Sequence, residues 1–132
     1  MKIDHIGYIT NNIEDTCREF NILGYTLKGD LVIDERQNCR LCIMESEAGD
    51  KIEMVEPCDD NVQMLKILKK RGCSSYHICY EVDDVMETYK SLSQKEGWIS
   101  IFKPVHAPAL ENRLITYFYN IKIGFVEFVN SK

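Results

Sequence analysis

The sequence predicts an α+β fold built from two β-α-β-β-β modules in tandem. The first observation is an internal repeat, because the segment DHIGYI that starts at Asp4 recurs as YHICYE from Tyr76. The second is that each half closes on a related strand-like segment, KIEMV from Lys51 and FVEFV from Phe125. The third is the order of patterns in each half, where a segment of helical periodicity follows the histidine strand and three strand-like segments come after it. Two copies of one unit therefore account for most of the chain.

The length, composition and net charge of the chain limit the kinds of molecule that it can bind. With 132 residues, 45% of them hydrophobic, the chain can bury a substantial core, so we treat residues 1–132 as a single domain. A net charge of −5 and a pI near 5.2 disfavour nucleic acid and anionic membranes, since neither would be attracted electrostatically. No apolar run approaches the roughly 20 residues of a membrane span, and the N-terminus lacks the apolar core of a signal peptide. We expect a cytoplasmic protein that binds a small-molecule substrate.

The first module is placed at residues 1–57, and its helix has clear end signals. The Asn11-Asn12 pair offers N-terminal caps, apolar residues recur every three to four positions from Ile13 to Phe20, and Gly24 suits a left-handed C-terminal position. Strands are expected over residues 2–9, 25–34, 38–45 and 51–56.

A linker helix is expected within residues 58–72, and the second module follows at residues 73–132. Its expected elements are a strand over 75–82, a helix over 84–95, and strands over 98–103, 113–119 and 124–130. The segment 104–112 contains Pro104 and Pro108, and prolines interrupt regular strands. We therefore expect this segment to be the longest loop, of the kind that often carries function.

The six cysteines are expected to be free thiols, because nothing in the sequence indicates secretion. Cys39 and Cys42 have the C-x-x-C spacing of redox and zinc sites. They fall in an expected strand, however, where residues three apart face opposite sides. We interpret them as small hydrophobic residues of the core.

Both repeat histidines are expected beside a small residue on the same face of a strand. Side chains alternate along a strand, so His5 shares a face with Gly7, and His77 shares one with Cys79. The small residue two places along leaves room for a bound molecule. The opposite face of each strand is apolar, which suits a covering helix.

Each module also ends with a glutamate in an otherwise apolar strand, Glu53 in the first and Glu127 in the second. Such a carboxylate should be paired, metal-bound or functional, because an unpaired buried charge is costly. Two imidazoles and two carboxylates suit zinc, nickel, cobalt, manganese or ferrous iron, and a six-coordinate ion would keep two positions for substrate oxygens. The alternative is a set of hydrogen-bonded histidines and solvated glutamates, but the recurrence of both residue types in both halves favours a metal site.

The segments DHIGY, KIEMVEP, YHICYEVDD and GFVEF resemble the vicinal oxygen chelate superfamily, which includes glyoxalase I, methylmalonyl-CoA epimerase, bleomycin-resistance proteins and extradiol dioxygenases. The resemblance covers essentially the whole chain and is strongest to the epimerase branch and to bacterial glyoxalase I-like proteins. It implies that the paired modules form a half-open eight-stranded barrel around one divalent ion (Zn, Ni, Co or Mn). The ligand positions of the family fall on His5, Glu53, His77 and Glu127.

The resemblance also implies a mechanism, in which the ion chelates substrate oxygens and stabilises an enolate while a carboxylate moves a proton on the adjacent carbon. Glu127 is expected to act as ligand and base, with Glu53 as its pseudo-symmetric partner. For contacts with the substrate we single out His106, Asn112 and Arg113.

The chain departs from the epimerases in places. It lacks their Gly-Ala-His-Gly-like loop and His-Pro pair, and Arg40 and Leu41 stand where some epimerases carry an additional acid. These departures leave the substrate open.

The predicted function is a metal-dependent isomerase or lyase acting next to a thioester or hemithioacetal carbonyl, methylmalonyl-CoA epimerase-like, with glyoxalase I (lactoylglutathione lyase) as the alternative. A non-catalytic drug-binding protein of the bleomycin-resistance type is a further alternative, although such proteins generally lack the four ligands. A dioxygenase, with two histidines and one carboxylate, is disfavoured by the fourth ligand. The family resemblance also implies a homodimer.

Overall fold

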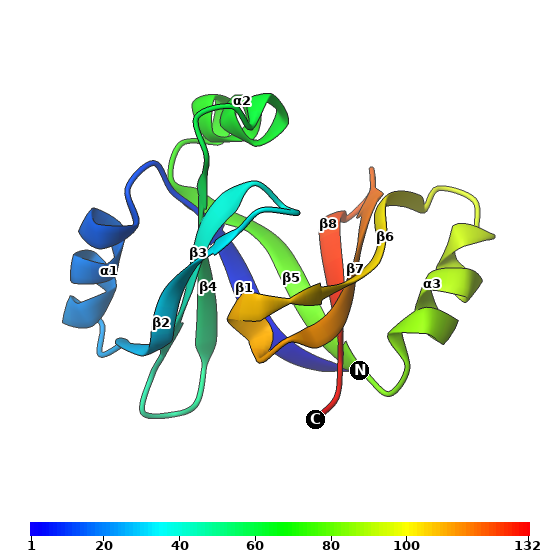
Figure 1. Cartoon of the computed structure of the whole chain (residues 1–132), viewed down its shortest axis with the longest axis horizontal. Coiled ribbons are helices and arrows are strands. Elements are labelled where there is room, and N and C mark those ends of the chain that lie inside the picture. The colour runs from blue at the N-terminus through cyan, green and yellow to red at the C-terminus, as the bar shows by residue number, and fades with distance from the viewer. The chain divides into compact units, whose positions relative to one another are not determined.

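The computed structural model describes residues 1–132, and the chain falls into two compact units (Figure 1). One unit is made of residues 6–75, and the other is made of residues 1–5 together with 76–132. The first five residues therefore belong to the unit that the second half of the chain forms. No helix in either unit has the length and apolarity that crossing a membrane requires.

The unit of residues 6–75 contains four strands in the order β2-β3-β4-β1. The pairs β2–β3 and β3–β4 are antiparallel, whereas β1 runs parallel to β4. The elements are β1 (Lys2–Ile9, of which residues 6–9 belong here), α1 (Ile13–Ile22), β2 (Thr26–Asp34), β3 (Cys39–Glu45), β4 (Lys51–Pro57) and α2 (Val62–Arg71).

Helix α1 begins at the predicted cap. The Asn12 side chain accepts a hydrogen bond from the backbone N–H of Asp15, which satisfies one of the unpaired donors at the helix start. Ile13, the buried residue of the helix, belongs to a core cluster with Cys42 of β3 and Met54 of β4. The helix therefore covers the apolar face of these strands, beside β2 in Figure 1.

The unit of residues 1–5 and 76–132 repeats this plan, with strands in the order β5-β8-β7-β6. Strand β5 is parallel to β8, and the pairs β7–β8 and β6–β7 are antiparallel. The elements are β5 (Ser74–Val82), α3 (Val85–Ser93), β6 (Ile99–Ala107), the short 3-10 helix η1 (Pro108–Leu110), β7 (Arg113–Asn120) and β8 (Gly124–Asn130).

Helix α3 is the counterpart of α1. Its cap is Asp84, whose carboxylate accepts from the backbone N–H of Glu87. Val85 is buried in a cluster with Phe118 of β7 and Phe128 of β8. Figure 1 shows the helix beside β6, and the helix also contacts β7 and β8.

The registers of the two parallel ladders match. Gly7 of β1 lies opposite Glu53 of β4, and Cys79 of β5 lies opposite Glu127 of β8. Together with the matching strand orders, this confirms the predicted α+β fold of tandem β-α-β-β-β modules. The sequence limits of the modules, 1–57 and 73–132, stay a prediction.

The prediction of a long irregular loop over residues 104–112 is wrong. Strand β6 continues through Pro104 to Ala107, and η1 follows directly. Within its unit β6 has a strand neighbour on one side only, and such a strand can include a proline without losing a ladder hydrogen bond. The pairing with β7 also shifts between Phe102 and Val105, so Pro104 sits at an irregularity of the ladder.

All six cysteines are free thiols, as expected. Cys39 and Cys42 are both buried in β3. Cys42 lies on the side of α1, where its sulfur is 3.8 Å from the sulfur of Cys17. The burial of the C-x-x-C pair within a strand confirms its interpretation as part of the core.

Candidate metal centre

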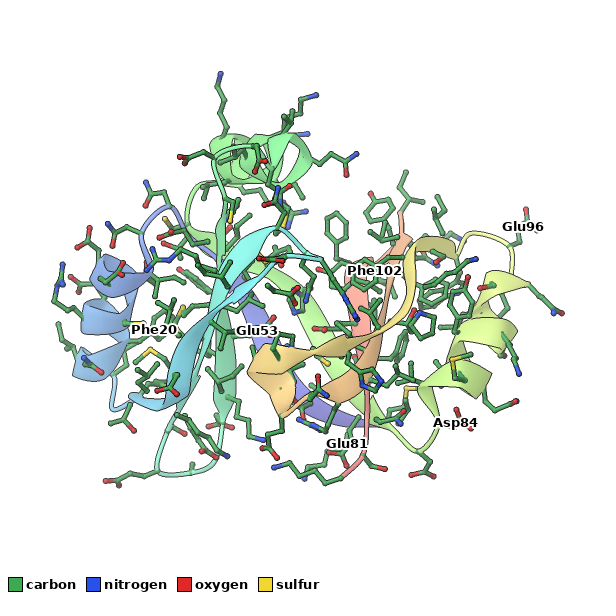
Figure 2. All side chains as sticks on the ribbon, viewed as in Figure 1. Phe20, Glu53, Glu81, Asp84, Glu96 and Phe102 are labelled. Carbon is green, nitrogen blue, oxygen red and sulfur yellow. The ribbon has the colours of Figure 1, made fainter.

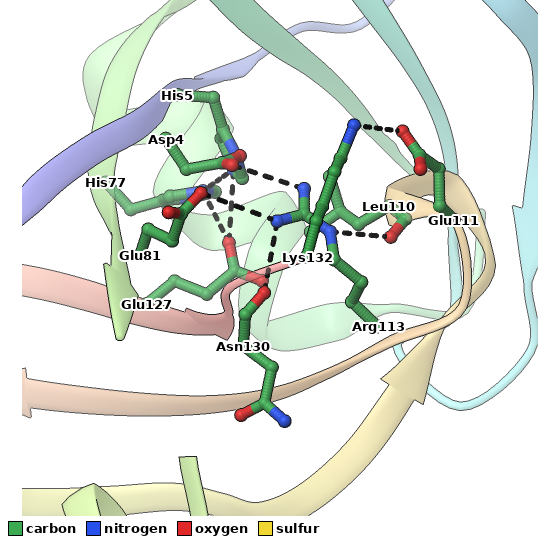
Figure 3. Close-up of polar contacts among 10 residues, drawn as sticks. All are labelled: Asp4, His5, His77, Glu81, Leu110, Glu111, Arg113, Glu127, Asn130 and Lys132. Atoms are coloured by element: carbon green, nitrogen blue, oxygen red, sulfur yellow. Dashed lines mark hydrogen bonds and ion pairs between the residues drawn. The ribbon is translucent and has the colours of Figure 1, made fainter. Parts of the chain in front are cut away.

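Three buried side chains converge in the unit of residues 1–5 and 76–132 (Figure 3). Nε2 of His77 lies 3.3 Å from Nε2 of His5. Oε2 of Glu127 lies 3.2 Å from Nε2 of His5 and 3.1 Å from Nε2 of His77. His5 is 1% exposed, His77 is 4% exposed and Glu127 is 2% exposed. Two imidazole nitrogens and one carboxylate oxygen therefore meet in the protein interior.

The strand register explains why these side chains meet. Glu127 lies opposite Cys79 in the β5–β8 ladder, and His77 is two residues before Cys79. Residues two apart on a strand share a face, and paired residues of neighbouring strands share it too. His77 and Glu127 are thus placed on one side of the sheet by its pleat. His5 joins them because the start of β1 belongs to this unit.

The other nitrogen of His5 has an acidic partner. Nδ1 of His5 lies 2.8 Å from Oδ2 of Asp4. The second carboxylate oxygen of Asp4 accepts a hydrogen bond from Nη2 of Arg113 at 3.1 Å. The buried cluster therefore continues through His5 to a carboxylate and a guanidinium.

Charge in this cluster is stabilised by hydrogen bonds rather than by solvent. Burial raises the pKa of Glu127, but hydrogen bonds from His5 and His77 outweigh it and lower the pKa to about 2. Burial also opposes the ionisation of Asp4, yet His5 and Arg113 hold its pKa well below the usual range. Burial and the nearby Glu127 raise the pKa of the Cys79 thiol well above its ordinary value. Both carboxyl groups are thus anionic and the thiol is neutral at pH 7.

Aromatic rings surround His77. The rings of Tyr76 and Tyr117 lie 4.6 and 5.3 Å from the imidazole, centroid to centroid, and both stand nearly perpendicular to it. Tyr117 also stacks on Phe102, which Figure 2 labels, at 5.6 Å, and lies 5.9 Å from Phe125. This aromatic wall lowers the local polarity, so charge–charge and charge–dipole interactions in the cluster are stronger than in water.

Glu53, the fourth predicted ligand, belongs to the unit of residues 6–75 (Figure 2). Its side chain is buried, with 4% exposure, in the middle of β4. It lies opposite Gly7 of β1 on one side and Ile43 of β3 on the other. This is the position of Glu127 in its own unit. The roles of Glu53 as a metal ligand and as the partner of Glu127 stay predictions.

The three predicted substrate contacts have different surroundings. His106 and Asn112 are exposed, and Nδ1 of His106 lies 2.9 Å from the backbone oxygen of Asn112. The side chain of Arg113 is only 11% exposed and donates to Asp4 and to two backbone carbonyl oxygens. Arg113 is therefore held by hydrogen bonds to other groups of the protein. A role of these three residues in substrate binding stays a prediction.

Asp4 and Tyr117 are parts of the cluster that sequence reasoning did not select. Asp4 has no counterpart in the repeat, because Tyr76 occupies the equivalent position before His77. Neighbouring strand residues also face opposite sides, so the pattern gives no reason to expect Asp4 to reach the ring of His5. The one available signal is the Asp-His dipeptide itself, since a carboxylate is a common partner of the second nitrogen of a ligating histidine.

A sequence comparison identifies the family. The profile of the Glyoxalase/Bleomycin resistance protein/Dioxygenase superfamily matches residues 4–117. The chain belongs to this superfamily. The matched range includes His5, Glu53 and His77, and no curated protein matches the chain.

Solved structures of the superfamily fold resemble the chain closely in backbone and weakly in sequence. A hypothetical protein from Bacillus halodurans C-125 matches with a TM-score of 0.82 and 24% identity over 99% of this chain and 94% of that one. Methylmalonyl-CoA epimerase from Mycobacterium tuberculosis matches with a TM-score of 0.84 and 19% identity, covering 99% and 88%. The Streptomyces coelicolor epimerase in complex with 2-nitronate-propionyl-CoA matches with a TM-score of 0.83 and 19% identity, covering 99% and 97%. At these identities the likeness establishes the fold.

The side chains present fit a divalent metal ion, as superfamily members use. Two imidazole nitrogens and a carboxylate oxygen are the donors that zinc, nickel, cobalt and manganese accept. The hydrogen bond from Nδ1 of His5 to a carboxylate is the arrangement that usually supports a ligating histidine. The negative charge of Glu127, which lies beside two imidazoles, also attracts a cation to this cluster.

Proposed function

We propose that the chain is a metal-dependent isomerase that moves a proton on the carbon next to a thioester carbonyl, in the manner of methylmalonyl-CoA epimerase. The observation that carries the proposal is the convergence of His5, His77 and Glu127 in the protein interior. It combines donors for a divalent ion with a carboxylate that can accept a proton. The fold shared with methylmalonyl-CoA epimerases supports the thioester as the substrate class.

Glu53 is proposed as the fourth ligand. The support is its equivalence to Glu127, since each glutamate is buried and each lies opposite a small residue two places after a histidine. The two glutamates thus hold the same register position in the two copies of the repeat. We therefore infer a set of two imidazoles and two carboxylates, one of each from either module.

The residues of the chain have separate tasks in this reaction. A divalent ion, when bound, supplies a Lewis acid for the carbonyl oxygens of the substrate. Glu127 takes the proton from the substrate carbon at its carboxylate, and Glu53, its pseudo-symmetric partner, is the second carboxylate proposed to act on that carbon. His5 and His77 place their Nε2 atoms beside the carboxylate of Glu127, and the aromatic wall limits the access of water.

Metal content and proton exchange test the proposal. Purified protein is analysed for bound metal, stripped with a chelator and reloaded with zinc, nickel, cobalt or manganese. Each form is incubated with methylmalonyl-CoA in deuterated water. We expect the reloaded protein to wash deuterium into the carbon next to the thioester, and the stripped protein to lose this activity.

A parallel assay tests the second candidate activity, that of glyoxalase I. Methylglyoxal with glutathione tests for lactoylglutathione formation, which would identify a lyase at the same cluster. Binding of metal without either reaction would contradict the thioester proposal, and failure to bind any divalent ion would contradict the metal centre itself. The homodimer expected from the resemblance stays a prediction, which light scattering on the same sample tests.

A further inference from the structure

The carboxylate of Asp4 is held from two sides inside the protein. Its side chain is 3% exposed. Oδ2 lies 2.8 Å from Nδ1 of His5, and Oδ1 accepts from Nη2 of Arg113 at 3.1 Å (Figure 3). A carboxylate with both oxygens engaged has little freedom to rotate, so the position of Asp4 is fixed relative to the imidazole.

Arg113 is fixed in turn by the backbone. Nη1 donates to the carbonyl oxygen of Asn130 at 3.1 Å, and Nε donates to that of Leu110 at 3.2 Å. The carboxylate of Glu81 lies further away, 3.9 Å from Nη1. The planar guanidinium therefore spans η1, the end of β8 and the start of β1, and its fork holds Asp4 in one geometry.

This chain of contacts determines which nitrogen of His5 is open to a metal ion. An ionised carboxylate can only accept, so the nitrogen that faces Asp4 must be the donor. A metal ion must then bind at the other nitrogen, Nε2, because a ring nitrogen that carries a hydrogen has no lone pair to offer. Nε2 is the atom that lies 3.3 Å from Nε2 of His77 and 3.2 Å from Glu127.

We propose that Asp4, locked by Arg113, is a positioning residue that holds the ring of His5 through Nδ1 and so makes Nε2 the nitrogen that binds the metal ion. The inference rests on the proposed function, because it concerns the same cation site. It assigns to Arg113 a task inside the protein in place of a contact with substrate. The two histidines then differ in the residue that precedes them. Asp4 precedes His5, whereas Tyr76 precedes His77.

The expected loss of metal affinity follows from the general behaviour of carboxylates that accept a hydrogen bond from a ligating histidine. Removal of the hydrogen-bond acceptor behind a ligating histidine typically weakens metal binding by about 10- to 100-fold. We expect this loss for Asp4→Asn, which keeps the shape of the side chain and removes its charge. We expect a smaller loss for Arg113→Lys, because lysine keeps a cation near Asp4 and loses the planar fork.

The experiment measures zinc and cobalt(II) affinity of metal-free protein by calorimetry, together with the visible absorption of the cobalt form. Glu81→Gln is the matched control, since it alters the other carboxylate beside Arg113, which lies 3.9 Å from Nη1 of the guanidinium. We expect weaker binding and an altered cobalt spectrum for Asp4→Asn, and wild-type values for Glu81→Gln. Unchanged affinity and spectrum for Asp4→Asn would overturn the inference.

A second measurement does not depend on the folding of any variant. The chain has three histidines, so ¹⁵N-labelled histidine gives few signals in the zinc-loaded wild-type protein. We expect His5 to show a protonated Nδ1 and a zinc-bound Nε2. Zinc at Nδ1 of His5 would overturn the inference while leaving the metal site intact. A wild-type protein that binds neither zinc nor cobalt would instead show that the proposed function is wrong.

Discussion

Cys79 lies directly opposite Glu127 in the β5–β8 ladder, and its thiol is fully buried. Gly7 holds the equivalent place opposite Glu53. Both modules thus place a small residue across from the buried glutamate of their last strand. This relationship gives the first prediction, because a larger side chain at position 79 must take space on the face that carries His77 and Glu127.

We expect Cys79→Leu to weaken zinc binding strongly and to lower the free energy of unfolding by about 1–3 kcal/mol, the usual cost of overpacking a core. Calorimetry with zinc and urea unfolding measure the two effects. Cys79→Ala is the control, since it keeps the position small and should retain zinc affinity close to wild type. Equal zinc affinity in the leucine variant would show that the space beside Glu127 is not needed.

Glu127→Gln separates catalysis from folding. The amide keeps the volume of the side chain but can neither take up a proton as a base nor carry the negative charge. We expect the rate of deuterium exchange into the substrate to fall by about 10²- to 10⁴-fold, the typical contribution of a general base. Circular dichroism should show an intact fold. Glu96→Gln, on the exposed turn after α3, is the control and should exchange at the wild-type rate. An unaltered rate in Glu127→Gln would exclude Glu127 as the base.

The stability of the metal-free protein should fall in acid because of Glu127. Its pKa of about 2 in the folded protein lies below the ordinary value of 4.5, so folding favours the ionised form. The resulting stabilisation is complete above pH 4.5 and is lost as the pH falls from 4.5 toward 2. Asp4, whose pKa is also lowered, acts in the same direction.

Urea unfolding at a series of pH values measures this effect. The Glu127→Gln variant has no carboxyl group at this position, so its free energy of unfolding should decrease less than that of wild type between pH 5 and pH 3. Parallel curves for the two proteins would mean that the ionised form of Glu127 is not favoured by folding.

Much of the fold could be predicted because the repeat supplies each signal twice. The caps Asn12 and Asp84 precede equivalent helices, and strand alternation places His77 and Glu127 on one face. The extent of β6 could not be predicted, because the effect of Pro104 depends on whether its strand has one neighbour or two. That is a property of the strand order, which local patterns do not contain.

The part of the site outside the repeat could not be predicted for a related reason. Asp4 reaches His5 through the ring nitrogen nearest the backbone, against the rule that adjacent strand residues point apart. Arg113 follows Asp4 by more than a hundred residues in the sequence, and no periodic pattern joins them. Alternation predicts faces of a strand but not rotamers, so these contacts require the folded structure.

The last prediction concerns the core behind the site. Phe118 of β7 has no exposed surface, and its ring packs near Tyr89, Trp98 and Phe128 at centroid distances of 6.0, 6.2 and 6.3 Å. Its neighbour Tyr117 faces the other side of the strand, toward His77. Removing the Phe118 ring should therefore affect stability far more than metal binding.

We expect Phe118→Ala to lower the free energy of unfolding by about 3–5 kcal/mol, the usual cost of deleting a buried phenyl ring. Ile121→Ala, at a position that is 82% exposed, should change it by less than about 0.5 kcal/mol. The fluorescence of Trp98, the only tryptophan, reports unfolding of this core directly. Zinc affinity below the unfolding transition should stay near the wild-type value in both variants, because the alternation of β7 separates the core face from the face that carries the histidine. A loss of zinc binding in folded Phe118→Ala would show that the two faces are coupled.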